Sequence, residues 1–126
     1  MWLNQISEEN CSVIAIHESF ETVASFVAKE AKETAKIVLY DKDLEKQQVI
    51  NCKDLEITSL KWHSSKNFLL ICWLDGSIGL VDCDTPEKLI REDSVHKAAI
   101  TRAEWSLNGK VVLTGDALGS AVVFYY

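Results

Sequence analysis

The sequence predicts an all-β protein made of short antiparallel strands and organised in repeats of about 43 residues. Three pairs of residues support this prediction, because the two members of each pair lie 43 positions apart. Coincidence of three offsets is not expected by chance, and a period of 40–45 residues containing short strands indicates stacked four-stranded units. The pairs are Trp62 with Trp105, Gly76 with Gly119, and Ile57 with Ile100.

The clearest copy of the repeat spans residues 57–83 and predicts three strands. Its first strand alternates, which places Leu60 and Trp62 on the same face as Thr58, and Ile57, Ser59 and Lys61 on the other face. Its second strand is a continuous apolar run, as expected for a strand that is buried on both faces. The predicted strands are residues 57–62, 68–73 and 77–81.

A tight hairpin turn is predicted at Asp75–Gly76, because glycine tolerates a positive φ and an aspartate side chain can cap the turn. Gly119 occupies the equivalent position in the last copy. The segment 115–119 is glycine-flanked, but it lacks the Gly-Lys-Ser/Thr ending and the following helix of a phosphate-binding loop. It is therefore interpreted as a second hairpin turn.

The other segments predict further strands around this copy. In residues 11–41 the tight turn is replaced by a longer charged loop at 29–34, with a one-turn helix over 30–36 as the alternative. The last strand of each complete unit is polar, as expected for an edge that faces water. Residues 1–10 fit either a frayed end or a strand. Eight further strands bring the total to eleven: residues 12–17, 22–28, 35–41, 47–51 and 88–92, and three within 100–126.

Composition and charge exclude several function classes. The chain has 126 residues, 48% hydrophobic and 25% charged, which is ordinary for one globular domain. Its net charge of −6 argues against nucleic-acid partners and against a polybasic membrane-surface patch. No apolar run approaches the roughly 20 residues of a membrane span, so no membrane insertion is expected. The first residues lack a secretory signal pattern, which predicts an intracellular protein.

No residue pattern predicts a catalytic, cofactor or metal site. The four cysteines form no CxxC pair and have no histidine at zinc-ligand spacing, so all four are expected to be reduced thiols. The three histidines have no convergent carboxylates in the sequence and are interpreted as structural. No Gly-x-Ser-x-Gly motif is present. The residues concerned are Cys11, Cys52, Cys72 and Cys83, and His17, His63 and His96.

The repeat resembles the WD40 family. Residues 95–110 contain His96, a branched aliphatic residue four positions later, and then Trp-Ser-x-x-Gly-Lys starting at Trp105. The closing Trp-Asp dipeptide of the family is weakened to Tyr-Asp at 40–41, Val-Asp at 81–82 and Phe-Tyr at 124–125. The resemblance implies blades of a β-propeller. These departures put in doubt the polar network that the family builds from such residues.

The resemblance assigns structural roles to six repeat positions. The tryptophans are expected to pack one blade against the next, and the others to form turns or the family's polar network. The blades are expected at about 11–52, 57–93 and 100–126, within a single partial propeller over residues 1–126. The six positions are Trp62, Trp105, Asp75, Gly76, Gly119 and His96.

A narrower resemblance covers residues 57–126. The Trp-Ser-x-x-Gly segment at 105–109, followed by Gly-Asp-x-Leu-Gly at 115–119, is similar to the first propeller of large subunits of intraflagellar transport complex A. These subunits carry WD40 propellers followed by a helical tail. The resemblance implies a non-catalytic protein-interaction scaffold in ciliary retrograde transport and cilium assembly, with other subunits of the complex as partners and a location in the cytoplasm, cilium or ciliary base.

Three blades are too few for a closed propeller, which has four to eight. The sequence therefore predicts an incomplete propeller, either part of a longer protein or closed by self-assembly or a partner. A monodisperse, cooperatively unfolding monomer in light scattering would argue against the first. Two other functions stay open: a WD40 scaffold of another trafficking or regulatory complex, and an enzyme built on a propeller.

Overall fold

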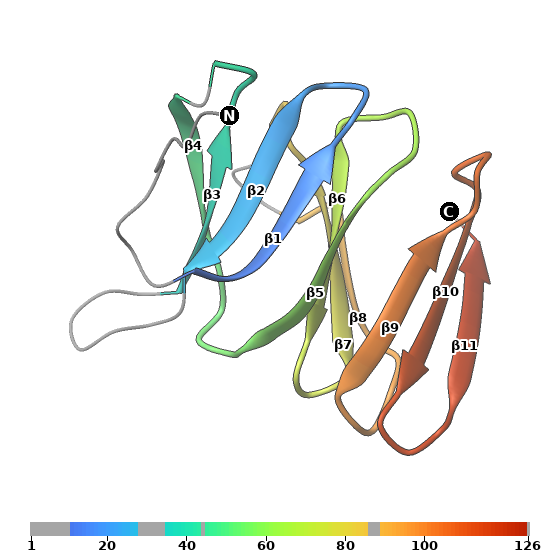
Figure 1. The fold of residues 1–126 in the computed structure, drawn as a ribbon. Helices are drawn as coiled ribbons and strands as arrows, with labels where there is room; N and C mark the ends of the chain where they lie inside the picture. Colours follow the sequence, from blue (N-terminus) through green and yellow to red (C-terminus); the bar gives the residue numbers. More distant parts are fainter. Residues whose placement is uncertain (1–10, 28–34, 44, 86–88, 126) are drawn as a thin grey trace, which may run out of the picture. The chain divides into compact units, whose positions relative to one another are not determined.

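A computed structural model describes residues 11–27, 35–43, 45–85 and 89–125. These residues form eleven β-strands and no α-helix (Figure 1), which confirms the predicted all-β class. The strands form three antiparallel sheets of four, four and three strands. The chain divides into two compact units, Met1–Asp54 and Leu55–Tyr126.

The first unit contains one sheet whose strands are hydrogen-bonded in sequence order. Val27, Val38 and Tyr40 form its buried apolar cluster, with Val23 packed against them. Buried His17 contacts Phe20 edge-on, at 4.8 Å between ring centroids. The predicted loop at 29–34, and the helix alternative over 30–36, lie outside the described residues. The strands are β1 (Cys11–His17), β2 (Thr22–Val27), β3 (Lys36–Tyr40) and β4 (Lys46–Asn51).

The second unit contains two sheets, one with the order β5-β6-β7-β8 and one with the order β11-β10-β9. The strand predicted at 88–92 begins later than expected, at Arg91, because it pairs only with the Ser77–Leu80 part of β7. The strands are β5 (Ile57–Trp62), β6 (Phe68–Trp73), β7 (Ser77–Asp82), β8 (Arg91–Ser94), β9 (Ile100–Trp105), β10 (Val111–Asp116) and β11 (Ala121–Tyr125).

The first strand of each sheet carries an irregularity near its start, where the register shifts relative to the next strand. In β5 this bulge lies between Ile57 and Ser59, so Ile57 and Leu60 are both buried. Simple alternation, which placed these two residues on opposite faces, was therefore wrong at this strand. A bulge adds one residue to one strand and changes which face the following side chains occupy. In β9, Ile100 and Ala103 are buried in the same way.

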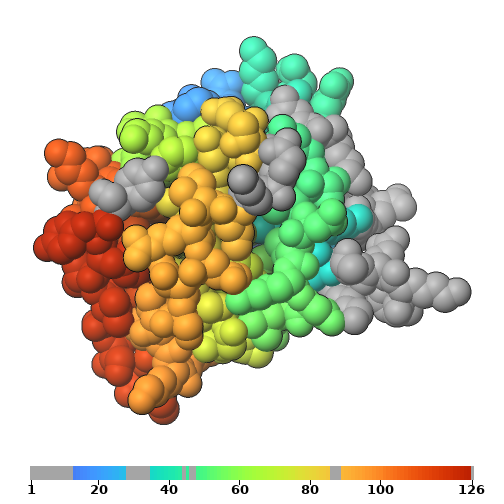
Figure 2. Space-filling view, turned by 180° about the vertical axis from the view of Figure 1, so that it is seen from behind, coloured from blue at the N-terminus to red at the C-terminus, as the bar shows by residue number. Residues whose placement is uncertain are grey.

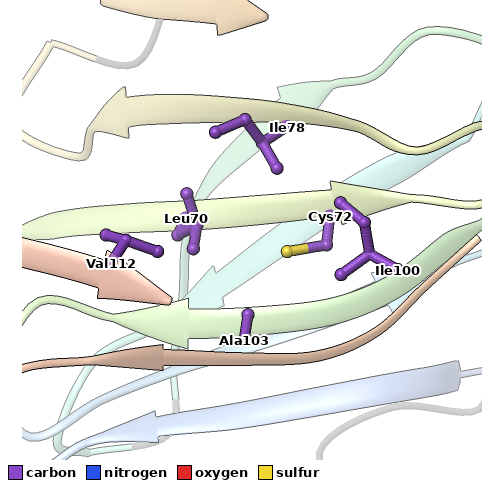
Figure 3. Close-up of a cluster of buried hydrophobic side chains, with 6 residues drawn as sticks. All are labelled: Leu70, Cys72, Ile78, Ile100, Ala103 and Val112. Atoms are coloured by element: carbon purple, nitrogen blue, oxygen red, sulfur yellow. The ribbon is translucent and has the colours of Figure 1, made fainter. Parts of the chain in front are cut away.

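The core of the second unit lies between its two sheets (Figure 3). Side chains from β6 and β7 meet side chains from β9 and β10, and each is at most 5% exposed. Burial of each leucine, isoleucine or valine side chain of this cluster contributes about 1.5–3 kcal/mol relative to leaving it in water. This cluster holds the two sheets together as one unit. Its members are Leu70, Cys72, Ile78, Ile100, Ala103 and Val112.

The β10–β11 part of the outward face of the third sheet is apolar and exposed, whereas β9 contributes the charged residues Arg102 and Glu104 to the same face. Leu113 pairs with Val123 across β10 and β11, and the two side chains are 48% and 53% exposed. Tyr125, on the same face, is 75% exposed. This face is one of the exposed apolar faces expected of an incomplete propeller, and contiguous exposed apolar surface usually marks a contact.

Candidate functional site

One chain of buried polar side chains crosses the second unit. Nδ1 of His96 lies 2.8 Å from Oδ2 of Asp116, and Nε2 of His96 lies 2.7 Å from Oγ1 of Thr114. Thr114 and Asp116 are alternate residues of β10 and share its inner face. His96 comes from the connection between β8 and β9. The three side chains therefore tie that connection to the β10–β11 hairpin.

The carboxylate of Asp116 also closes the β10–β11 turn. Its Oδ1 accepts hydrogen bonds from the backbone N–H groups of Leu118 and Ser120, at 2.9 and 3.0 Å. Desolvation raises the pKa of the Asp116 carboxyl. This rise is outweighed by the hydrogen bonds from the Ser120 N–H, the His96 imidazole and the Leu118 N–H and by the charge of His96. The pKa of Asp116 is therefore lowered below its usual value. Stability from this carboxylate is present above the unfolded-state pKa of about 3.9 and is lost as the pH falls through the lower folded-state pKa.

The order hydroxyl, imidazole, carboxylate resembles that of a hydrolase triad. In this chain the hydroxyl cannot reach a substrate, because Thr114 is 0% exposed. The His96 and Asp116 side chains are also almost fully buried. A nucleophile must contact its substrate, so this arrangement supports packing rather than hydrolysis.

The second sheet replaces this polar chain with apolar side chains. The positions 43 residues before Thr114 and Asp116 are Ile71 and Trp73, which are both 1% exposed. Gly79 leaves room for the Trp73 ring, since a Cβ there would lie 2.8 Å from two ring carbons. The doubt about the family's polar network therefore applies to the second sheet, whereas the third sheet has a His-Thr-Asp chain.

Sequence reasoning singled out His96 but missed its partners. Thr114 and Asp116 stand where the second copy has Ile71 and Trp73, so aligning the copies would have shown two polar residues inside an otherwise apolar strand. Because a buried polar side chain requires a partner, that contrast was the available signal.

The predicted turn residues lie in hairpins. Gly76 has φ +89° and follows Asp75, whose Oδ1 accepts the Ser77 N–H at 2.9 Å. The Gly76 carbonyl accepts the N–H groups of Val95 and His96, at 3.3 and 3.0 Å. Gly119 has φ +90° in the β10–β11 turn, but no atom lies within 4 Å of where its Cβ would be. The two equivalent glycines thus share a conformation but have different surroundings.

The predicted tryptophans, Trp62 and Trp105, end β5 and β9 and are both half-buried. The Trp105 indole N–H donates to the Lys61 carbonyl at 3.2 Å, which joins the third sheet to the second. Its ring also meets His63 edge-on, at 4.8 Å between centroids. The two Trp105 contacts therefore lie at the interface between the second and third sheets.

An apolar groove opens between the two sheets of the second unit. Leu80, Trp105 and Phe124 line it, and Arg91 and Tyr125 contribute to its wall. Figure 2 shows this side of the unit, with the surface of β8 beside that of β11. Arg91 is paired with Asp93. The groove thus offers apolar surface and one paired cation.

The described residues contain no group of three or more His, Cys, Asp or Glu side chains placed to hold a metal ion. Across that same part of the chain, no helix has the length and hydropathy needed to span a membrane.

Replacing Thr114 with valine is expected to lower the free energy of unfolding by about 1–3 kcal/mol. The substitution keeps the shape but leaves the buried His96 Nε2 without its hydroxyl partner. Thr101→Val is the matched control, because Thr101 is exposed and its hydroxyl bond to the Gly115 carbonyl is long, at 3.4 Å; we expect a change within about 0.5 kcal/mol. Urea unfolding of both variants checks this, and equal midpoints would contradict it.

The Cys72 and Cys83 thiols are expected to resist alkylation at pH 8. Burial raises the pKa of each thiol from 9.0 to about 12. The positive charge of Lys61 opposes this rise at Cys72, and the negative charges of Asp82 and Asp84 add to it at Cys83. The native thiolate population is therefore very small. In a Cys11→Ser, Cys52→Ser variant, iodoacetamide should react far faster in urea than in buffer. Equal rates would show that these thiols are accessible in the native state.

The same thiols make the fold sensitive to alkaline pH. Their stabilising effect is fully present below the unfolded-state pKa near 9.0 and is lost as the pH rises towards the folded-state value of about 12. Within that window the unfolding equilibrium constant should rise by up to about tenfold per pH unit for each thiol.

The antiparallel sheets, their shared turn positions and the sheet-to-sheet core place this chain in the class of β-propeller proteins with WD40-type blades. The sequence matches the family described as the IFT140 first beta-propeller over residues 3–125. The chain belongs to this family, which agrees with the resemblance to subunits of intraflagellar transport complex A.

No curated protein matches the sequence at a significant level. One further comparison bears on the fold alone. Among solved structures, a chain in the crystal structure of a mitotic checkpoint complex superposes with a TM-score of 0.73 at 15% identity. The match covers 88% of this chain and 32% of the other, so this chain spans about a third of the length of the chain it matches. At that identity the likeness shows a shared propeller fold.

Proposed function

We propose that the chain is a non-catalytic protein-interaction scaffold of intraflagellar transport complex A, acting in ciliary retrograde transport and cilium assembly. The observation that carries the proposal is the family match over residues 3–125. The proposed partners are other protein subunits of the complex, without nucleic-acid binding or membrane insertion. The proposed location is the cytoplasm, the cilium or the ciliary base.

Two features of the second unit, an enclosed polar chain and exposed apolar side chains, support a binding role rather than catalysis. Its hydroxyl–imidazole–carboxylate chain is enclosed, because Thr114 is 0% exposed. By contrast, its four most exposed large apolar side chains among the described residues, Leu107, Leu118, Val123 and Tyr125, lie in the third sheet and its turns. Leu107 and Leu118, in the two turns of that sheet, are 98% and 78% exposed. Apolar surface presented on a rigid sheet is suited to protein association.

The test is recovery of partners from ciliated cells that express the tagged chain. Enrichment of complex A subunits, measured by quantitative mass spectrometry, supports the proposal. Enrichment of vesicle-coat or other trafficking subunits instead would reject it in favour of a different WD40 scaffold. Hydrolase activity that remains after contaminating enzymes have been removed would favour a propeller enzyme.

A pair of glycine variants provides the matched control. Gly119→Ala changes a turn with no neighbour within 4 Å, whereas Gly76→Ala disrupts a turn enclosed by the β8–β9 connection. Recovery of complex A subunits should persist with Gly119→Ala and decrease with Gly76→Ala. Equal recovery with both would show that capture does not depend on the folded second unit.

A further inference from the structure

His63 is held in one protonation state by its hydrogen bonds. It lies in the β5–β6 turn and is 3% exposed. Its Nδ1 accepts hydrogen bonds from the backbone N–H groups of Ser65 and Lys66, at 3.1 and 3.0 Å. A nitrogen that accepts from two donors carries no proton, so the proton lies on Nε2, which is 2.9 Å from the Gly109 carbonyl oxygen. The ring is therefore the neutral Nε2–H tautomer.

This ring makes one of the contacts between the second and third sheets. The carbonyl that it reaches belongs to the β9–β10 turn, 46 residues away. Gly109 has φ +71°, and a Cβ at that position would collide with Cε1 and Nε2 of His63. Trp105 packs edge-on against the same ring and donates to the Lys61 carbonyl. We call His63, Trp105, Gly109 and the Lys61 carbonyl the His63 joint.

We propose that the His63 joint is a pH-sensitive contact, closed when His63 is neutral and opened when His63 is protonated. An imidazolium carries N–H groups on both nitrogens. Its Nδ1–H would point at the Ser65 and Lys66 N–H groups, so both hydrogen bonds would be lost and three donors would face one another. A buried donor without an acceptor is unfavourable. The ring can take up a proton only by leaving its site.

The charges around the joint do not offset this loss. The elements that pack against His63 are β5, β6, β9 and the two adjoining turns. Along them the cationic side chains outnumber the carboxylates, and the carboxylate of Glu104 lies 3.8 Å from Lys61 Nζ. Lys66 Nζ lies 5.6 Å from the Phe68 ring centroid, beside the joint. Nearby cations disfavour an imidazolium. The charged residues are Lys61, Lys66, Arg102, Glu104 and Lys110.

His96 provides an internal contrast. Its Nδ1 faces the Asp116 carboxylate, and its Nε2 faces the Thr114 hydroxyl, which can donate or accept. Both protonation states of His96 therefore keep their hydrogen bonds. Of these two buried histidines in the second unit, only His63 requires the neutral form.

The test is amide hydrogen exchange of the 126-residue chain between pH 7.5 and 5.5, corrected for intrinsic exchange rates. A free histidine takes up its proton near pH 6.5, so the opening constant at the Ser65 and Lys66 amides should rise by about tenfold over this interval. The Leu118 and Ser120 amides, held by Asp116, are the internal reference and should stay unchanged. A parallel rise at all four amides, or no rise at any, would overturn the proposal.

His63→Gln is the matched variant, because its amide can donate to the Gly109 carbonyl but does not titrate. It should remove the pH dependence at Ser65 and Lys66, whereas persistence of that dependence would overturn the proposal. If the variant does not fold, nitrogen-15 spectra of the wild-type histidine side chains decide. They should show the Nε2–H tautomer of His63 at pH 7.5, and an Nδ1–H tautomer would refute the proposed joint.

Discussion

Gly76→Ala is expected to lower the free energy of unfolding by about 4 kcal/mol. Two costs combine at this position. Alanine at φ +89° is strained by about 1–3 kcal/mol. Its Cβ would also collide with the His96 carbonyl and lie 2.7 Å from the Ala98 carbonyl oxygen. The β8–β9 connection would have to move away, which breaks the bonds from the Val95 and His96 N–H groups to the Gly76 carbonyl.

Gly119→Ala separates these two costs, because it has the strain without the collision. Gly119 has φ +90°, and its Cβ would meet no atom within 4 Å. We expect a loss of about 1–3 kcal/mol from strain alone. Equilibrium unfolding in urea, followed by tryptophan fluorescence, measures both variants. Losses of equal size would show that the contact between Gly76 and the β8–β9 connection does not stabilise the fold.

The repeat was readable in the sequence because it depends on residues with distinctive conformational or packing properties. Glycine at a positive-φ turn and tryptophan at a strand end recur with the period of the fold, and they fix the hairpins locally. The all-β class followed from these positions and was confirmed. The start of β8 was misplaced because a polar edge strand has no buried face to constrain its register.

The contacts that organise the second unit were not readable from local pattern. His63 is bound to Gly109 across 46 residues, and His96 to Asp116 across 20. Neither partner lies at a motif spacing. The bulge at Ile57 was also missed, because a shift of backbone register leaves no mark on the alternation of side chains until the pairing strand is known. Thr114 and Asp116 could have been found by comparing copies.

The second large effect on the free energy of unfolding is expected in the second sheet. It comes from Gly79→Ala and Trp73→Phe, measured singly and together as a double-mutant cycle. Gly79→Ala should cost about 3 kcal/mol, because its Cβ would lie 2.8 Å from the Cη2 and Cζ3 atoms of the 1%-exposed Trp73 ring. Trp73→Phe removes those two atoms and should cost about 2 kcal/mol for the space left behind.

Combining the two substitutions should cost less than the sum of their separate effects, with a coupling of about 2 kcal/mol, because the added methyl group enters the space that the shorter ring vacates. Gly115→Ala is the control on β10. Its Cβ would lie 3.9 Å from the Ser120 carbonyl oxygen, in ordinary contact, so alanine should be neutral or stabilising by about 0.5 kcal/mol. Additive effects in the cycle would mean that Gly79 is not required by the Trp73 ring. Coupling would show that the second sheet uses a tryptophan–glycine pair where the third uses His96, Thr114 and Asp116.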